Sequence, residues 1–180
     1  MSDTADATAS PAASPWILRF ASQVPAAAPV LDLACGGGRH ARLFLAAGHP
    51  VLLVDRDLDR VADLRVRSDV ECLTADLESA PWPLGHRRFG AVVVTNYLWR
   101  PILPRIIEAV APGGLLLYET FAMGNERFGR PRNPDHLLRP GELVEAVRGR
   151  LTVLAYGQVT LGPPRPAVVQ RIAARHPGPA

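Results

Sequence analysis

The sequence predicts an α/β fold with a doubly wound, mainly parallel sheet, and three observations support this. Strand-like and helix-like segments alternate along the 180 residues. The strand-like segments are continuous apolar runs, which is typical of parallel strands that are covered on both faces. Three glycines, Gly36 to Gly38, follow the first run almost at once, and a helix-like segment comes after them.

The elements follow one another in a regular order. Ser14 and Pro15 predict the start of a helix in which Trp16, Phe20 and Val24 share one face. Apolar runs predict strands at residues 29–35, 50–55, 70–77, 89–97, 115–121, 151–159 and 166–175. Helical patterns predict further helices at residues 41–48, 57–67, 101–110 and 141–149.

Composition bounds the class of protein. Residues 1–13 are small and polar and predict a disordered tail, so we expect a single domain over residues 14–175. There is no run of 18 apolar residues, so we expect no membrane span. Cys35 and Cys72 lack the spacing of a disulfide framework, and no CxxC or HExxH motif indicates a metal site. These features predict free thiols in a reducing cytoplasm.

The basic residues narrow the choice of ligand. All 20 are arginine, and the chain has no lysine. Phosphate loops of the GxxxxGK[ST] type, kinase ATP sites and pyridoxal Schiff bases all require a lysine, which excludes these sites. The net charge of +3 is weak evidence for nucleic acid, because such binders usually cluster their charge.

Polar residues follow several predicted strands directly. The glycine turn, Asp55, Asp76, Asn96 and Glu119 each come after an apolar run. The carboxyl ends of parallel strands meet at one edge of the sheet, where doubly wound folds bind ligands. Any one of these positions could be an ordinary loop residue, but five together indicate a binding site.

The glycine turn does not fit a dinucleotide. The GxGxxG fingerprint needs a third glycine for close packing of helix and strand, and this chain has Arg39 there. Asp32 is also unusual inside an apolar strand, because a buried carboxyl needs hydrogen-bond partners.

These residues resemble a known family. The pattern Asp32-x-Ala34-Cys35-Gly36-x-Gly38 resembles motif I of the class I S-adenosylmethionine-dependent methyltransferases. Asp55 and Asp76 match that family's acidic residues after its second and third strands. Residues 111–119, 151–159 and 166–174 resemble its fifth strand and its last two strands, and residues 118–143 are similar to a bacterial subgroup of tellurite-resistance-type methyltransferases.

The resemblance implies a fold, a cofactor and a set of contacts. The fold is a Rossmann-like sheet of strand order 3-2-1-4-5-7-6 with strand 7 antiparallel, and the cofactor is S-adenosylmethionine. In this order strand 2 separates the two cysteines by about 10 Å, too far for a disulfide. The implied cofactor-binding residues are Asp32, Ala34, Cys35, Gly36, Gly38, Asp55, Arg56, Asp76, Leu77 and Asn96.

The acceptor side is less well defined. Methyl transfer needs a base only if the acceptor loses a proton, and the candidates are Tyr97, Glu119 and His136. The sequence Thr95-Asn96-Tyr97 differs from the NPPY signature of enzymes that methylate amino groups of nucleic acid bases.

Residues 122–140 form a long stretch without periodicity that carries several arginines. We expect this segment to close the acceptor pocket, with Tyr97, Arg127, Arg130 and Arg132 binding a small, anionic molecule. The competing interpretation is that these arginines only pin the loop.

Three functions stay open at this point. They are a small-molecule methyltransferase, an RNA or protein methyltransferase, and a non-catalytic S-adenosylmethionine-binding protein. The sequence does not define the acceptor, the attacked atom or the oligomeric state.

Overall fold

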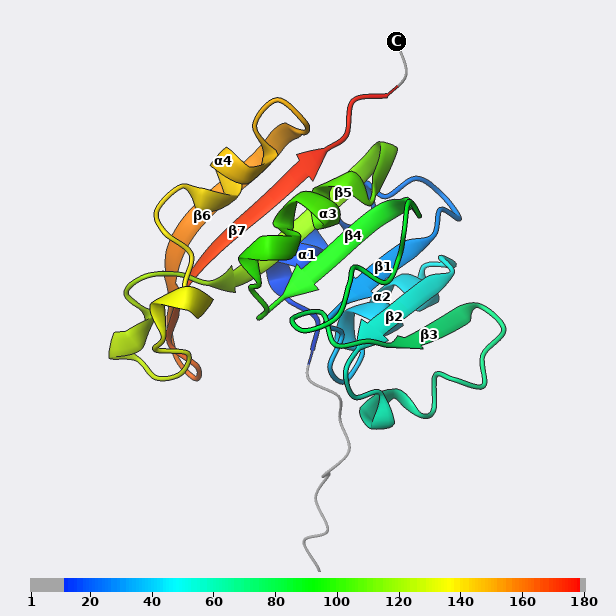
Figure 1. The fold of residues 1–180 in the computed structure, drawn as a ribbon, viewed down its shortest axis with the longest axis horizontal. Helices are drawn as coiled ribbons and strands as arrows, with labels where there is room; N and C mark the ends of the chain where they lie inside the picture. The colour runs from blue at the N-terminus through cyan, green and yellow to red at the C-terminus, as the bar shows by residue number, and fades with distance from the viewer. Residues whose placement is uncertain (1–11, 179–180) are drawn as a thin grey trace, which may run out of the picture.

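The computed structural model describes residues 12–178, which form one seven-stranded sheet with helices on both faces (Figure 1). The strand order is β3-β2-β1-β4-β5-β7-β6, and β7 runs antiparallel to both of its neighbours. The other pairs are parallel. This confirms the predicted fold class and strand order. The prediction of a disordered tail falls mainly on residues 1–11, which lie outside the described residues.

The strands are β1 (Val30–Leu33), β2 (Val51–Asp55), β3 (Val70–Thr74), β4 (Phe89–Thr95), β5 (Val110–Phe121), β6 (Thr152–Leu161) and β7 (Ala167–Arg175). The α-helices are α1 (Pro15–Ala21), α2 (Arg39–Ala46), α3 (Leu103–Glu108) and α4 (Glu142–Val147). Short 3₁₀ turns are η1 (Asp59–Val61), η2 (Arg100–Ile102), η3 (Asn125–Arg127) and η4 (Pro134–His136). Within residues 12–178, the structure holds no helix with the length and apolarity that crossing a membrane requires.

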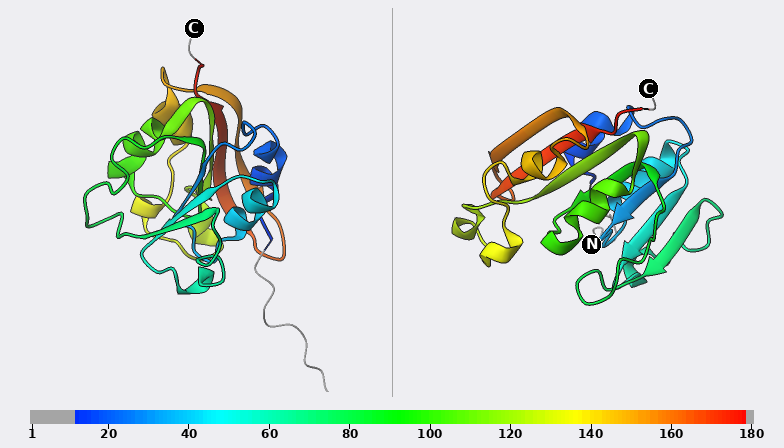
Figure 2. Two further views of the ribbon diagram at one scale, coloured as in Figure 1. Left: turned by 90° about the vertical axis from the view of Figure 1, so that its right-hand side faces the viewer. Right: turned by 45° about the horizontal axis from the view of Figure 1, so that its top comes forward.

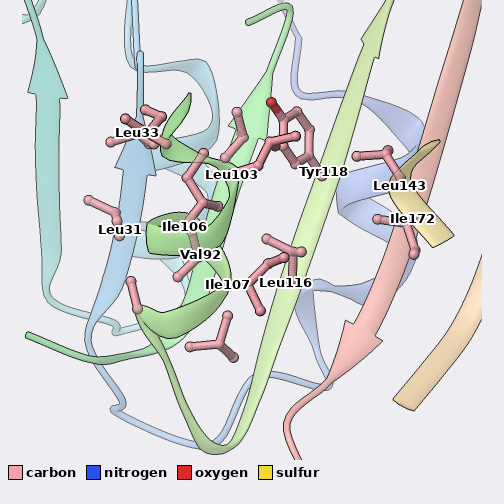
Figure 3. Packing of buried hydrophobic residues seen from close by; sticks show 14 of the residues in the cluster. Leu31, Leu33, Val92, Leu103, Ile106, Ile107, Leu116, Tyr118, Leu143 and Ile172 are labelled. Atoms are coloured by element: carbon pink, nitrogen blue, oxygen red, sulfur yellow. The ribbon is translucent and has the colours of Figure 1, made fainter. Parts of the chain in front are cut away.

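The sheet has a separate apolar core on each face. Helices α1 and α2 cover one face and α3 covers the other, as the two views of Figure 2 show. Leu31, Val92 and Leu116 come from β1, β4 and β5 and pack under Ile106 and Ile107 of α3 (Figure 3). Because side chains of successive strand residues point to opposite faces, burial on both faces requires the continuous apolar runs of the sequence.

The chain departs from the predicted helices at two places. Residues 57–67 form η1 and further turns instead of an amphipathic helix. The side chain of Asp55 accepts a hydrogen bond from the amide of Asp57, and that of Asp57 accepts one from Asp59. Such local bonds compete with helix formation. The second departure is β5, which starts at Val110, the last residue of the helix predicted over 101–110, and not at residue 115.

Residues 122–140 are an ordered loop with a closed base. Ala122 and Leu138 form an isolated bridge, and the Met123 amide donates to the Leu138 carbonyl at 2.9 Å. The buried side chain of Asn125 ties the loop to β7, because its Oδ1 accepts from the Val168 amide at 3.2 Å. In Figure 1 this segment (yellow-green to yellow) lies near the edge to which the arrowheads of β1, β2 and β4 point.

Candidate functional site

The glycine turn connects β1 to α2 with an unusual backbone. Gly36 has φ of +53° and Gly38 has φ of +69°, a region that glycine adopts without strain. A Cβ on Gly38 would lie 2.8 Å from Val61, so this glycine lets η1 pack closely against the turn. A Cβ on Gly36 would meet no protein atom within 4 Å, so the chain leaves open space beside this residue.

Asp32 holds the turn from inside the sheet. Its side chain is buried, and Oδ2 accepts a hydrogen bond from the Ala41 amide in the first turn of α2 at 2.9 Å. Burial raises the pKa of Asp32 to about 7, although the Ala41 bond and the charge of Arg39 act to lower it. This bond is the partner that a carboxyl inside an apolar strand requires.

The carboxylates after β2 and β3 are also held by backbone amides. Asp55 accepts from the Gly36 amide at 2.8 Å, which fixes the end of β2 to the glycine turn. Asp76 accepts from the Glu78 amide at 2.9 Å and from the hydroxyl of Ser79. The bond from Ser79, and then that from Glu78, lowers the pKa of Asp76, so this group is ionised at neutral pH.

These elements surround a cavity of about 300 Å³ at the carboxyl edge of β1 to β4. Two of its lining residues, Ala34 and Asn96, have positive φ of +55° and +54°, which non-glycine residues rarely adopt. Backbone strain of this kind is concentrated at ligand sites. The lining residues are Ala34, Asp55, Arg56, Ala75, Asp76, Leu77, Glu78, Asn96 and Tyr97.

A second cavity of about 190 Å³ adjoins the first over β4 and β5. Glu78, Asn96 and Tyr97 line both cavities and so form the boundary between them. The other lining residues of the second cavity are Leu98, Thr120, Phe121, Pro131 and His136. Pro131 and His136 of the loop therefore form part of the wall of the second cavity.

Tyr97 has an unusual environment at this boundary. Its hydroxyl oxygen is buried and has no hydrogen-bond partner within the described residues. Burial, and then the charges of Glu78, Asp76 and Asp55, raise the pKa of Tyr97 well above its usual value. The phenol therefore stays protonated at neutral pH, which fits a hydrogen-bonding wall of the site better than a general base.

The three acid–base candidates are not brought together. Tyr97 and His136 line the second cavity, but Glu119 does not. The carboxylate of Glu119 is buried on the α1 face, where it accepts from the Ser14 hydroxyl at 2.7 Å and lies 3.8 Å from Arg171.

His40 joins the same buried group, and the sequence analysis missed it. Its Nε2 accepts from the Ser14 amide at 3.1 Å, so Nδ1 carries the proton of the neutral ring and faces Thr95 at 3.4 Å. Burial, and then the charge of Arg39, lower the pKa of His40 to about 3. The one signal for this group was its position, because His40 lies at the start of the helix after the glycine turn and Glu119 lies near the end of β5.

The arginines of the loop lie outside the pocket. Arg127, Arg130 and Arg132 are exposed, and within residues 12–178 no arginine lines the second cavity. Arg127 donates to the carbonyl of Gly124 in its own loop at 3.2 Å, and its guanidinium lies over Phe128.

Arg100 of η2 is the residue that holds the loop. It donates to Glu142 at 2.6 Å and 3.0 Å and to the carbonyls of Asp135 and Leu137 at 2.7 Å each. Burial alone would raise the pKa of Glu142, but the hydrogen bonds from Arg100 and Arg139 outweigh it and lower this pKa. No local pattern around Arg100 indicated this role.

Comparison with known proteins decides the family. Residues 30–114, from β1 to the start of β5, match the methyltransferase domain family. The chain carries a methyltransferase domain. Its fold is that of the class I S-adenosylmethionine-dependent methyltransferases, the family that motif I resembles. None of the curated proteins is similar enough to this chain to count as a match.

Three solved structures share the fold. The 1,6-didemethyltoxoflavin-N1-methyltransferase of Burkholderia thailandensis, with 1,6-didemethyltoxoflavin and S-adenosylhomocysteine bound, is 22% identical with a TM-score of 0.67, covering 91% of this chain and 77% of that one. The N-methyltransferase NodS of Bradyrhizobium japonicum is 16% identical with a TM-score of 0.70, covering 89% and 92%. TehB of Haemophilus influenzae is 22% identical with a TM-score of 0.69, covering 88% of this chain and 61% of TehB.

The first cavity of this methyltransferase fits the cofactor. Carboxylates of Asp55 and Asp76 can accept hydrogen bonds from hydroxyl or amino groups, and Ala75 and Leu77 offer apolar walls. The open space beside Gly36 permits a ligand to approach the backbone of the turn.

Proposed function

We propose that this methyltransferase acts on a small-molecule acceptor. The observation that carries the proposal is the pair of adjoining cavities, which share Glu78, Asn96 and Tyr97. A second cavity of about 190 Å³, partly closed by Pro131 and His136 of the ordered loop, suits a small ligand better than a folded macromolecule. The small molecule bound to the Burkholderia structure supports this acceptor class.

We assign the cofactor to the first cavity. Asp55 would accept hydrogen bonds from ribose hydroxyls, and Asp76 and Leu77 would contact the base. The turn of Ala34, Cys35, Gly36 and Gly38 would approach the amino acid part, while Arg56 and Asn96 complete the walls. Asp32 would act through the turn, because its bond to Ala41 orients α2.

The proposed mechanism relies on positioning. The cofactor supplies a methyl group on a positively charged sulfonium, so the chain needs no catalytic triad. Asn96 and Tyr97 separate the two cavities and would align the acceptor, while Phe121 and Leu98 would exclude water. His136 is the side chain of the second cavity that could accept a proton where the acceptor loses one.

The expected anionic acceptor is not part of this proposal. Arg127, Arg130 and Arg132 are exposed and do not line the second cavity, so they offer an anion there no arginine partner. We further propose a cytoplasmic location, because Cys35 and Cys72 are both free thiols.

The test combines cofactor binding with methyl transfer. We expect S-adenosylhomocysteine to bind in calorimetry, and Asp55→Ala to weaken it by about 1–3 kcal/mol because hydrogen-bonding groups lose their partner. Asp69→Ala is the matched control, since Asp69 pairs with Arg67 on the surface and should leave the affinity unchanged.

Transfer is then measured with radiolabelled cofactor and a cell extract separated into metabolites, RNA and protein. Label in the metabolite fraction supports the proposal. Label in RNA that decreases as the salt concentration rises would show an RNA acceptor instead, and label in protein would show a protein acceptor. No label in any fraction would favour a non-catalytic binding protein.

A further inference from the structure

The boundary between the two cavities carries a carboxylate. Glu78 is exposed to solvent and lines both cavities, beside Asn96 and Tyr97. None of the ion pairs among residues 12–178 involves Glu78. Its charge is therefore available to a ligand.

No arginine among residues 12–178 lines the second cavity. Its other polar lining groups are Asn96, Tyr97, Thr120 and His136. The buried hydroxyl of Tyr97 lacks a partner and can bond to a polar atom of a ligand. Glu78 is also the nearby charge with the largest effect on the pKa of Tyr97, which indicates that its negative field reaches this hydroxyl.

We propose that the acceptor of this methyltransferase is an amine, selected by Glu78 at the boundary of the cavities, an inference that rests on the proposed function. A carboxylate or phenolate acceptor in the second cavity would be repelled by Glu78, and no arginine among residues 12–178 lines that cavity to offset the repulsion. A cationic or neutral amine meets a complementary carboxylate and the free hydroxyl of Tyr97.

The same carboxylate favours the chemistry of an amine. The amine first gives one N–H proton to water if it enters as an ammonium. Its lone pair then forms the C–N bond while the C–S bond of the donor breaks and leaves its electron pair on sulfur. Positive charge thereby passes to nitrogen, close to Glu78, and a carboxylate at the place where positive charge develops lowers the barrier.

The preference for an amine is tested without turnover by the binding of two probes of similar size and opposite charge. Benzylamine and benzoate are titrated by calorimetry into the protein saturated with S-adenosylhomocysteine. We expect benzylamine to bind at least tenfold more tightly than benzoate. Glu78→Gln, likewise saturated with S-adenosylhomocysteine, should reduce this preference to less than threefold. Glu145→Gln, which removes an exposed carboxylate of α4, is the matched control and should keep the preference.

Several outcomes would overturn the inference. Equal or tighter binding of benzoate, binding of neither probe, or a preference that survives Glu78→Gln all contradict it while the proposed function stands. Failure of S-adenosylhomocysteine to bind to the wild-type chain would instead contradict the proposed function itself.

Discussion

The two halves of the site differ in how their polar groups are satisfied. In the cofactor half, Asp32, Asp55 and Asp76 each accept a hydrogen bond from a backbone amide. In the acceptor half, the hydroxyl of Tyr97 is buried and lacks a partner within the described residues. A buried polar group without a partner is unfavourable, so the acceptor half is completed by its ligand, whereas the cofactor half is already organised.

The halves also differ in where their residues come from. The cofactor half is built from the ends of four neighbouring strands, β3, β2, β1 and β4, and the turn between β1 and α2. The acceptor half takes residues that follow β3 and β4, residues of β5, and residues of a loop that Arg100 holds through Glu142 and two carbonyls. A change in that loop can therefore alter the acceptor while the cofactor site stays the same.

The largest expected effect concerns the cofactor half. Gly36 and Gly85 have the same φ of +53°, and neither has a protein atom within 4 Å of an added Cβ. Gly36→Val and Gly85→Val should therefore strain the backbone equally, by about 1–3 kcal/mol. We expect Gly36→Val to weaken S-adenosylhomocysteine binding about 100-fold, or about 3 kcal/mol, because its side chain enters the cofactor's space.

The Gly36 amide donates to Asp55 in the wall of the first cavity, whereas Gly85 lies in the loop between β3 and β4 and lines neither cavity, so Gly85→Val should leave the affinity unchanged in calorimetry. Thermal unfolding of the two variants should give similar melting temperatures. Equal loss of affinity in both would show that strain, and not the position of Gly36, disturbs binding.

An effect of intermediate size is expected for Asp32. Among the carboxylates of the cofactor half, it should make the stability of the fold depend on pH. Its pKa of about 7 in the fold lies above the ordinary value of 3.8, so between these pH values the folded chain binds more protons than the unfolded chain. Its contribution to stability is full below pH 3.8 and is lost as the pH rises through about 7.

Asp32→Asn should abolish this loss, because an amide oxygen can still accept from Ala41 and does not ionise. In urea unfolding at several pH values, the free energy of unfolding of the variant relative to that of the wild type should rise by about 2 kcal/mol between pH 5 and pH 8. Asp69→Asn, whose wild-type carboxylate pairs with Arg67, should show no such gain. A constant difference across this range would mean that Asp32 is ionised throughout.

The cofactor half of the site was easier to predict from the sequence than the acceptor half. The strands, the glycine turn and the acidic strand ends were predictable from local pattern, whereas the strand order followed from the resemblance to a known family; the partner that Asp32 requires is the Ala41 amide nine residues later. The helix over residues 57–67 was wrong because Asp55 and Asp57 bind backbone amides instead, a competition that hydrophobic periodicity does not reveal.

The acceptor half depended on contacts between distant residues. Arg100, which holds the loop, meets Glu142 42 positions away. Without such pairs in view, the loop arginines were assigned to the pocket by composition, and Glu78 was missed although it follows Asp76 by two residues.

The smallest expected effect concerns these loop arginines, and Arg100 provides the contrast. Arg100→Gln removes bonds to Glu142, whose side chain is only 10% exposed, and should destabilise the fold by about 2 kcal/mol. For a chain of this size we expect the melting temperature to fall by about 4–8 °C. The acceptor KM should rise while S-adenosylhomocysteine affinity is kept, because the loop contributes Pro131 and His136 to the second cavity alone.

Replacing Arg127 and Arg132 together by Gln should change neither property. Both side chains are exposed, and the one bond that Arg127 donates, to Gly124, stays within its loop. We expect kcat and the acceptor KM to stay within about twofold of the wild type, as exposed pairs contribute little. A tenfold loss of methyl transfer, with normal melting temperature and normal S-adenosylhomocysteine binding, would return these arginines to the acceptor. It would also require the loop to turn inward when the acceptor binds, and the amine selected by Glu78 would then have to carry an anionic group as well.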